Sequence, residues 1–159
     1  MSKAPAIRIV LAISVCVAIA AWLWVRHHRL REYASFQLVA VGQALAAYVQ
    51  DHGGVFPHSA KCLVRDKLIR EVASDEYEVA PRPVPGYPWS NMYPRRVRIA
   101  MRDVCVGWDG IANCEGGLLI GSRRFSTSLR GLAENISSWL SERMMSLPNG
   151  KRGQGDITD

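Results

Sequence analysis

The sequence of 159 residues holds few side chains that could perform catalysis, and the best candidates are cysteines close to a histidine or an acid. Cys62 follows His52 and His58, and Cys105 precedes Asp109. A nucleophilic site needs a base beside the nucleophile and a third group that orients the base. His52 and His58 instead flank a Gly-Gly-Val-Phe-Pro turn, where exposed side chains are equally well expected. The sequence contains no HExxH, GxSxG or P-loop motif, so it predicts neither an enzyme nor a cofactor site.

Metal-binding residue types are present, but their spacing does not match a metal site. The cysteines show no CxxC spacing and no paired histidines in register, which argues against zinc. Asp103, Asp109 and Glu115 could offer oxygen ligands to Ca²⁺, but they follow no known ligand spacing. We interpret them as solvated loop carboxylates and predict no bound metal.

A disulfide is the one covalent feature that the cysteines suggest. Cys105 and Cys114 are nine positions apart and could close a loop if the domain faces an oxidising compartment. Such a bridge leaves Cys62 without a partner, so the pattern is compatible with both the oxidised and the reduced state. Cys16 lies in an apolar stretch and is interpreted as a small hydrophobic residue.

The net charge of +6 comes from basic residues that are spread along the chain rather than gathered in one patch. No aromatic residues alternate with arginines as a stacking surface for bases would require, and we predict no nucleic-acid partner. The first basic group directly follows an apolar segment, where such residues contact lipid headgroups. The main groups are Arg26, Arg29 and Arg31, then Arg95, Arg96, Arg98 and Arg102, then Arg123 and Arg124.

The apolar segment runs from Ile9 to Val25 and contains seventeen residues without a charge. As a helix it would be about 26 Å long, slightly short of a hydrocarbon core of about 30 Å. Arg8 can extend to the headgroups and so lengthen the span. Trp22 and Trp24 stand near its end, where indole rings favour the membrane interface. The segment, with Ile9, Trp22, Trp24 and Val25 as its marker residues, predicts a single-pass membrane protein whose partner is the lipid bilayer.

A cleaved signal peptide is the alternative for this segment, because Ala18-Ile19-Ala20 fits an A-x-A cleavage site. The apolar stretch continues past that site through both tryptophans, which favours a retained anchor. Orientation is less constrained, since Lys3, Arg8 and the amino terminus nearly balance the arginines that follow Val25. That balance leans slightly toward a cytoplasmic C-terminal domain.

The pattern after the anchor predicts that the same helix continues for about 45 residues in all, or about 65 Å. Proline is absent between Arg8 and Asp51, and Leu38, Val41, Leu45 and Tyr48 form one apolar stripe. Gly53-Gly54 and Pro57 should end this helix. We expect a short second helix from Ser59 to Arg70.

The segment from Pro81 to Pro94 predicts a long loop stiffened by proline. Its aromatic residues Tyr87, Trp89 and Tyr93 either pack on the sheet or form a contact loop for a small ligand. A third interpretation is a proline-rich segment that binds a partner's aromatic groove.

The remaining chain predicts a small antiparallel sheet followed by a helix. Val97, Ile99 and Met101 alternate with arginines, as in a half-buried strand. Two more strands are expected at 118–120 and 123–127, with Gly121-Ser122 in the hairpin turn between them. The last helix should bury one face, and the final residues should be disordered. The residues of that face are Leu129, Leu132, Ile136, Trp139, Leu140 and Met144.

This order of elements resembles the type IV pilin and type II secretion pseudopilin superfamily. The similarity is carried by residues 38–48, LVAVGQALAAY, followed by Asp51-His52-Gly53-Gly54 and Phe56-Pro57. The span from Asp103 to Thr127 also looks like the closing hairpin of that superfamily. The resemblance implies an α+β fold in which a long transmembrane helix continues into a small antiparallel sheet, with an amphipathic C-terminal helix. The expected organisation is an anchor over 1–31, a pilin-like domain over 32–147 and a disordered tail over 148–159.

The N-terminal segment departs from the superfamily's pattern. No glycine precedes the apolar helix, and no glutamate lies in its first turns, so the prepilin peptidase motif is missing. We therefore expect a protein that is neither cleaved by that peptidase nor packed into an ordinary pilus. The resemblance implies a structural or interaction subunit of a bacterial secretion or envelope assembly, with an extracytoplasmic domain and membrane or pilin-like partners. The alternative is a membrane-tethered domain that binds a small ligand.

Overall fold

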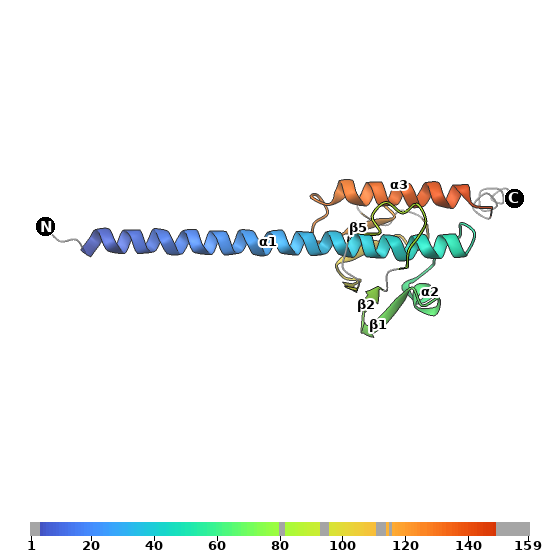
Figure 1. Ribbon diagram of the computed structural model, residues 1–159, viewed down its shortest axis with the longest axis horizontal. Helices are drawn as coiled ribbons and strands as arrows, with labels where there is room; N and C mark the ends of the chain where they lie inside the picture. Colours follow the sequence, from blue (N-terminus) through green and yellow to red (C-terminus); the bar gives the residue numbers. More distant parts are fainter. Residues whose placement is uncertain (1–3, 80–81, 93–95, 111–113, 115, 149–159) are drawn as a thin grey trace. The chain divides into compact units, whose positions relative to one another are not determined.

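The computed structural model describes residues 4–79, 82–92, 96–110, 114 and 116–148 (Figure 1), with side chains described from Ile9 onward. The chain divides into two compact units, Met1–Tyr33 and Ala34–Asp159. Helix α1, Ala4–Asp51, contributes its first part to one unit and its last part to the other.

The first unit consists of the N-terminal part of α1, and its apolar side chains are exposed. Ile9 is 60% exposed, Val15 is 56% exposed and Trp24 is 70% exposed. This is the one helix in the described part of the chain that is long and apolar enough to cross a membrane. The prediction of a long apolar N-terminal helix is therefore confirmed.

The second unit is built around the C-terminal part of α1. The predicted stripe of Leu38, Val41, Leu45 and Tyr48 is buried, but so is every other residue from 37 to 49. The burial extends beyond the predicted stripe because alanines and one glycine let neighbouring segments approach this part of α1 closely. Two buried glutamines in this stretch donate hydrogen bonds from their side-chain amides. Gln37 donates to the backbone carbonyl of Arg98, and Gln43 donates to that of Arg82.

Helix α1 ends where the glycines predicted. Gly53 and Gly54 have φ angles of 63° and 101°, a conformation that favours glycine, and the Gly54 N–H donates to the carbonyl of Val49 at 2.8 Å. The following helix, α2, is shorter than expected and spans Ala60–Arg65. Lys67 takes a φ of 58° and turns the chain, so that Ile69 already belongs to a strand.

Three strands form an antiparallel sheet in the order β1-β2-β3. Their bounds are Ile69–Ala73, Glu76–Val79 and Val97–Ala100. Strand β3 confirms the predicted alternation at Val97, Arg98 and Ile99, but it ends at Ala100, so that Met101 lies in the following turn and not in the strand. The hairpin of β1 and β2 was not predicted from the sequence. Its turn contains Asp75 at a φ of 58°, and its register shifts between Glu71 and Ala73.

A second sheet contains β4, Val104–Val106, and β5, Ile120–Ser122, which pair antiparallel. The predicted hairpin in this region was wrong. Gly121 and Ser122 lie inside β5 instead of in a turn, and residues 123–127 form turns instead of a strand. The long connection from β4 to β5 replaces the tight turn that the sequence suggested.

Helix α3, Arg130–Ser146, completes the second unit. Ile136 and Leu140 are fully buried as predicted, and Leu132, Trp139 and Met144 are half-buried. The Oγ of Ser137 accepts a hydrogen bond from the N–H of Ile120 at 3.3 Å, which links α3 to β5. The α+β class with a C-terminal helix is confirmed. The predicted tail lies outside the described residues after Pro148.

Candidate functional sites

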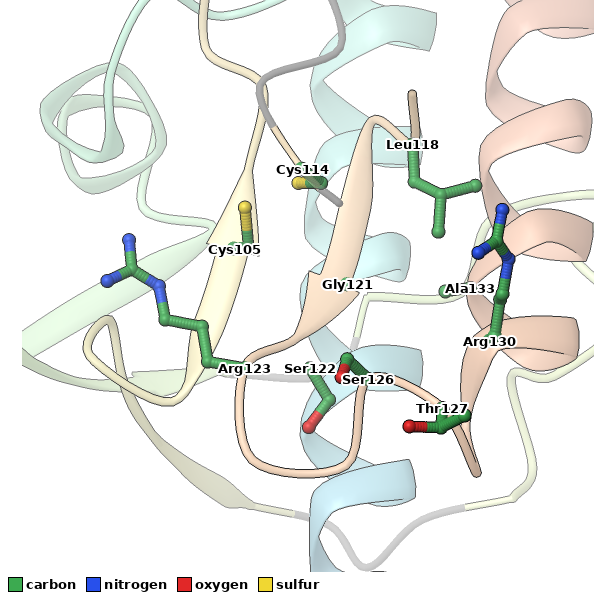
Figure 2. A pocket seen from close by; sticks show the side chains of 10 residues that line it. All are labelled: Cys105, Cys114, Leu118, Gly121, Ser122, Arg123, Ser126, Thr127, Arg130 and Ala133. Atoms are coloured by element: carbon green, nitrogen blue, oxygen red, sulfur yellow. The ribbon is translucent and has the colours of Figure 1, made fainter. Parts of the chain in front are cut away.

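A pocket of about 550 Å³ opens beside the β4–β5 sheet and the start of α3 (Figure 2). Strand β4 contributes Cys105, and α3 contributes Arg130 and Ala133. The turns between β5 and α3 contribute polar side chains, among them Ser126 and Thr127.

One wall of the pocket is the pair Cys105 and Cys114. Cys105 lies opposite Gly121 in the sheet register, and a Cβ at Gly121 would be 3.8 Å from the Cβ of Cys114. Cys114 therefore lies over the glycine and next to Cys105, with the two sulfur atoms facing one another (Figure 2). Both residues are present as thiols and share a hydrogen bond. Burial raises the pKa of the Cys114 thiol, and the hydrogen bond that this thiol donates to Cys105 raises it further.

The rim of the pocket is basic and rich in hydroxyl groups. Arg123 and Arg130 lie on opposite sides of it (Figure 2), and Arg130 pairs with Glu134 at 2.8 Å. The hydroxyl of Ser122 is buried and accepts a hydrogen bond from the Phe125 N–H at 3.2 Å. These groups could hold a polar or anionic small molecule. The sequence prediction missed this pocket, because its residues were assigned to a hairpin.

The loop proposed as a contact surface is used largely for packing. Tyr87 is 3% exposed, and its hydroxyl donates to the carbonyl of Val39 at 3.0 Å. Its ring meets those of Trp89 and Trp139 edge-on, with centroids 5.3 and 5.2 Å away. Trp89 is half-buried, and Tyr93 lies outside the described residues.

The candidate catalytic residues His52, His58 and Cys62 have separate surroundings and different partners. His52 stacks on Tyr48 at 3.9 Å between centroids, and its Nε2 lies 3.3 Å from a carboxylate oxygen of Asp66. His58 is exposed. Cys62 instead interacts with Ser59, whose Oγ is 3.8 Å from the sulfur, and this hydrogen bond lowers the pKa of Cys62. The structure thus places Cys62 with a hydroxyl group and His52 with a carboxylate.

Metal ligands are not gathered in the part of the chain that the structure describes. No three side chains of His, Cys, Asp or Glu there are placed to hold an ion together. Asp103 and Asp109 are among the described residues, whereas Glu115 is not.

Three of the predicted marker residues, Trp22, Trp24 and Val25, lie beside basic residues at the end of the apolar segment, whereas Ile9 lies at its start. The guanidinium carbon of Arg26 is 5.3 Å from the ring centroid of Trp22, and Trp24 stacks on His28 at 5.8 Å. Trp22, Arg26 and Arg29 line a shallow groove on one side of α1. Such aromatic and cationic side chains are typical of the boundary between lipid and water.

Comparison with protein-family models, with curated proteins and with solved structures gives no match to this chain.

Proposed function

We propose that this protein is a single-pass membrane protein with a structural or interaction role, a pseudopilin-like subunit that docks onto a secretion or envelope assembly. The observation that carries the proposal is the contrast within α1. Its apolar side chains from Ile9 to Val25 are exposed, whereas residues 37–49 of the same helix are buried in the domain. One helix thereby serves as the anchor and as the core of the folded unit.

The exposed part of α1 needs an apolar environment. Leaving a Val, Leu or Ile side chain in water forgoes about 1.5–3 kcal/mol, and this segment exposes many of them. A bilayer supplies that environment, and a partner helix in the membrane can cover one side of the segment by close packing. The small residues Ser14, Ala18 and Ala21 lie on one face of the helix and would permit such an approach.

Site-specific photo-crosslinking in membranes tests the interaction role. Val15 and Val17 are both exposed and lie about 200° apart around the helix. A photoreactive residue at one of these positions should give a crosslink to a protein of defined mass, and the other position should crosslink mainly to lipid. Lipid crosslinks from both positions, together with a monomeric particle in mild detergent, would contradict the proposal.

The proposed orientation places the folded domain outside the cytoplasm. A topology reporter fused after Asp159 distinguishes the two sides, because alkaline phosphatase is active only when exported and green fluorescent protein mainly when retained. An active phosphatase fusion is expected. A fluorescent fusion with inactive phosphatase would overturn the orientation and the disulfide with it.

Small-ligand binding is the second candidate function, and the pocket beside Cys105 favours it. The rim arginines suit a carboxylate or phosphate group, with hydroxyls from Ser126 and Thr127 as further donors. Calorimetric titration of the full chain with inorganic phosphate and with citrate tests this function. Binding that Arg130→Gln weakens and Arg70→Gln does not would support it, and no heat with either anion would count against it.

A further inference from the structure

One side of α1 carries two arginines at the point where the apolar segment ends. The groove that Arg26 and Arg29 line also contains Trp22, Val25 and Tyr33. Arg26 lies over the Trp22 ring, and neither arginine forms an ion pair with any residue that the structure describes. From these placements we infer a binding site for the phosphate of an anionic phospholipid. The inference rests on the proposed membrane location.

The depth of the two arginines matches the headgroup layer. If Val25 marks the end of the hydrocarbon core, Arg26 is about 1.5 Å and Arg29 about 6 Å further along the helix axis. The headgroup layer on each side of a bilayer is about 5–8 Å thick. Side chains on a helix point back toward its N-terminus, so the Arg29 guanidinium reaches back into the headgroup layer. The Arg26 guanidinium lies over Trp22 at the edge of the core, and its side chain is long enough to extend outward to the same phosphate.

The groove offers matching groups to both ends of a lipid headgroup. Guanidinium groups bind phosphate oxygens through two parallel hydrogen bonds, and two arginines on one side supply such donors to one phosphate. Val25 and the Trp22 ring, which also line the groove, offer apolar contacts to the upper acyl chains below the phosphate. A zwitterionic lipid such as phosphatidylcholine brings its own ammonium group to the arginines, whereas phosphatidylglycerol does not. The site should therefore prefer an anionic lipid.

The same helix provides a matched control. Arg31 lies two residues beyond Arg29 and about 180° around the helix from Trp22, so it faces away from the groove. Arg29→Gln and Arg31→Gln remove the same charge at nearly the same depth. A general attraction between a basic segment and an anionic surface responds equally to both substitutions. A specific lipid-binding site in the groove should lose affinity with Arg29→Gln and keep it with Arg31→Gln.

Native mass spectrometry of the full chain, released from mixed vesicles of phosphatidylglycerol and phosphatidylcholine, tests the inference. The unsubstituted chain should retain phosphatidylglycerol in preference. Arg26→Gln and Arg29→Gln should each weaken retention about tenfold, because each removes charge-assisted hydrogen bonds to the phosphate. Arg31→Gln should change it less than twofold. Excess inorganic phosphate should not displace the lipid, because the free ion lacks the apolar contacts.

Three results would overturn the inference. They are equal loss with Arg29→Gln and Arg31→Gln, equal retention of the two lipids, and displacement by inorganic phosphate. Flotation first measures whether the chain inserts into the vesicles. Membrane insertion, which the proposed function requires, is thereby tested separately from the lipid preference. A chain that floats but shows no lipid preference contradicts only the lipid site. A chain that does not float contradicts the membrane location as well.

Discussion

The hydroxyl of Tyr87 occupies the space where a side chain on Gly42 would begin. A Cβ at Gly42 would collide with that hydroxyl and would lie 2.7 Å from a methyl group of Ile136. The absence of a side chain thus lets the proline-rich loop and α3 both contact the buried part of α1. Tyr87 completes the contact by its hydrogen bond to Val39.

Gly42→Ala should destabilise the folded domain by about 2 kcal/mol, because the added methyl group overpacks this junction. Gly131→Ala is the matched control. Gly131 lies in the first turn of α3, and a Cβ there meets no atom within 4 Å, so alanine should be neutral or stabilise by up to about 1 kcal/mol. Thermal unfolding of the full chain in detergent, followed by tryptophan fluorescence, compares the two. Equal midpoints would refute the packing argument.

Tyr87→Phe should cost about 1 kcal/mol on its own, since it leaves the Val39 carbonyl without its donor. Combined with Gly42→Ala it should cost less than the sum, because removing the hydroxyl relieves part of the collision. A double-mutant cycle from the same unfolding measurements gives the coupling. Strict additivity would mean that the two residues do not compete for this space.

Oxidation of Cys105 and Cys114 should produce a disulfide that stabilises the domain by about 2.5 kcal/mol through closure of a short loop. The sulfur atoms already share a hydrogen bond, so little rearrangement is needed. Alkylation under denaturing conditions, followed by mass measurement, should show two protected cysteines in the chain isolated from the envelope. Cys16 and Cys62 should both be alkylated, and alkylation of all four residues would contradict the prediction.

Cys62 should react with iodoacetamide at lower pH than an ordinary thiol. The Ser59 hydrogen bond lowers the pKa of Cys62, so a larger thiolate fraction is present near neutral pH. Ser59→Ala should raise that pKa and slow the reaction at neutral pH, whereas at high pH, above both pKa values, the rates should converge. The helix cap loses no side-chain hydrogen bond in this variant. Ser126→Ala is the control, and an unchanged pH profile in Ser59→Ala would disprove the role of Ser59.

The parts of the fold that the sequence predicted are those with strong periodicity. An apolar run, a proline-free continuation and a pair of glycines define α1, and alternation of apolar residues with arginine defines β3. Helix α3 likewise follows from the spacing of Ile136 and Leu140. In each case the period of the side chains reports directly which face is buried.

The parts that the sequence did not predict lack such a signal. Strand β1 buries only Ile69 and exposes its other four residues, so no alternation is visible. Its turn uses Asp75 in the left-handed region where a hairpin signature would have glycine. Strand β5 is three residues long and buried throughout, and its Gly121 suggests a turn by composition. The pocket depends on this strand and on Cys114, so it could not be located before β5 was placed correctly.

The central claim is that the mature chain keeps its apolar helix in the membrane. Intact mass measurement of the protein from an alkali-washed membrane fraction tests it most directly. We expect a membrane-retained chain whose mass includes Ile9–Val25. A chain that begins at Ala21 and is released into the soluble fraction would contradict it.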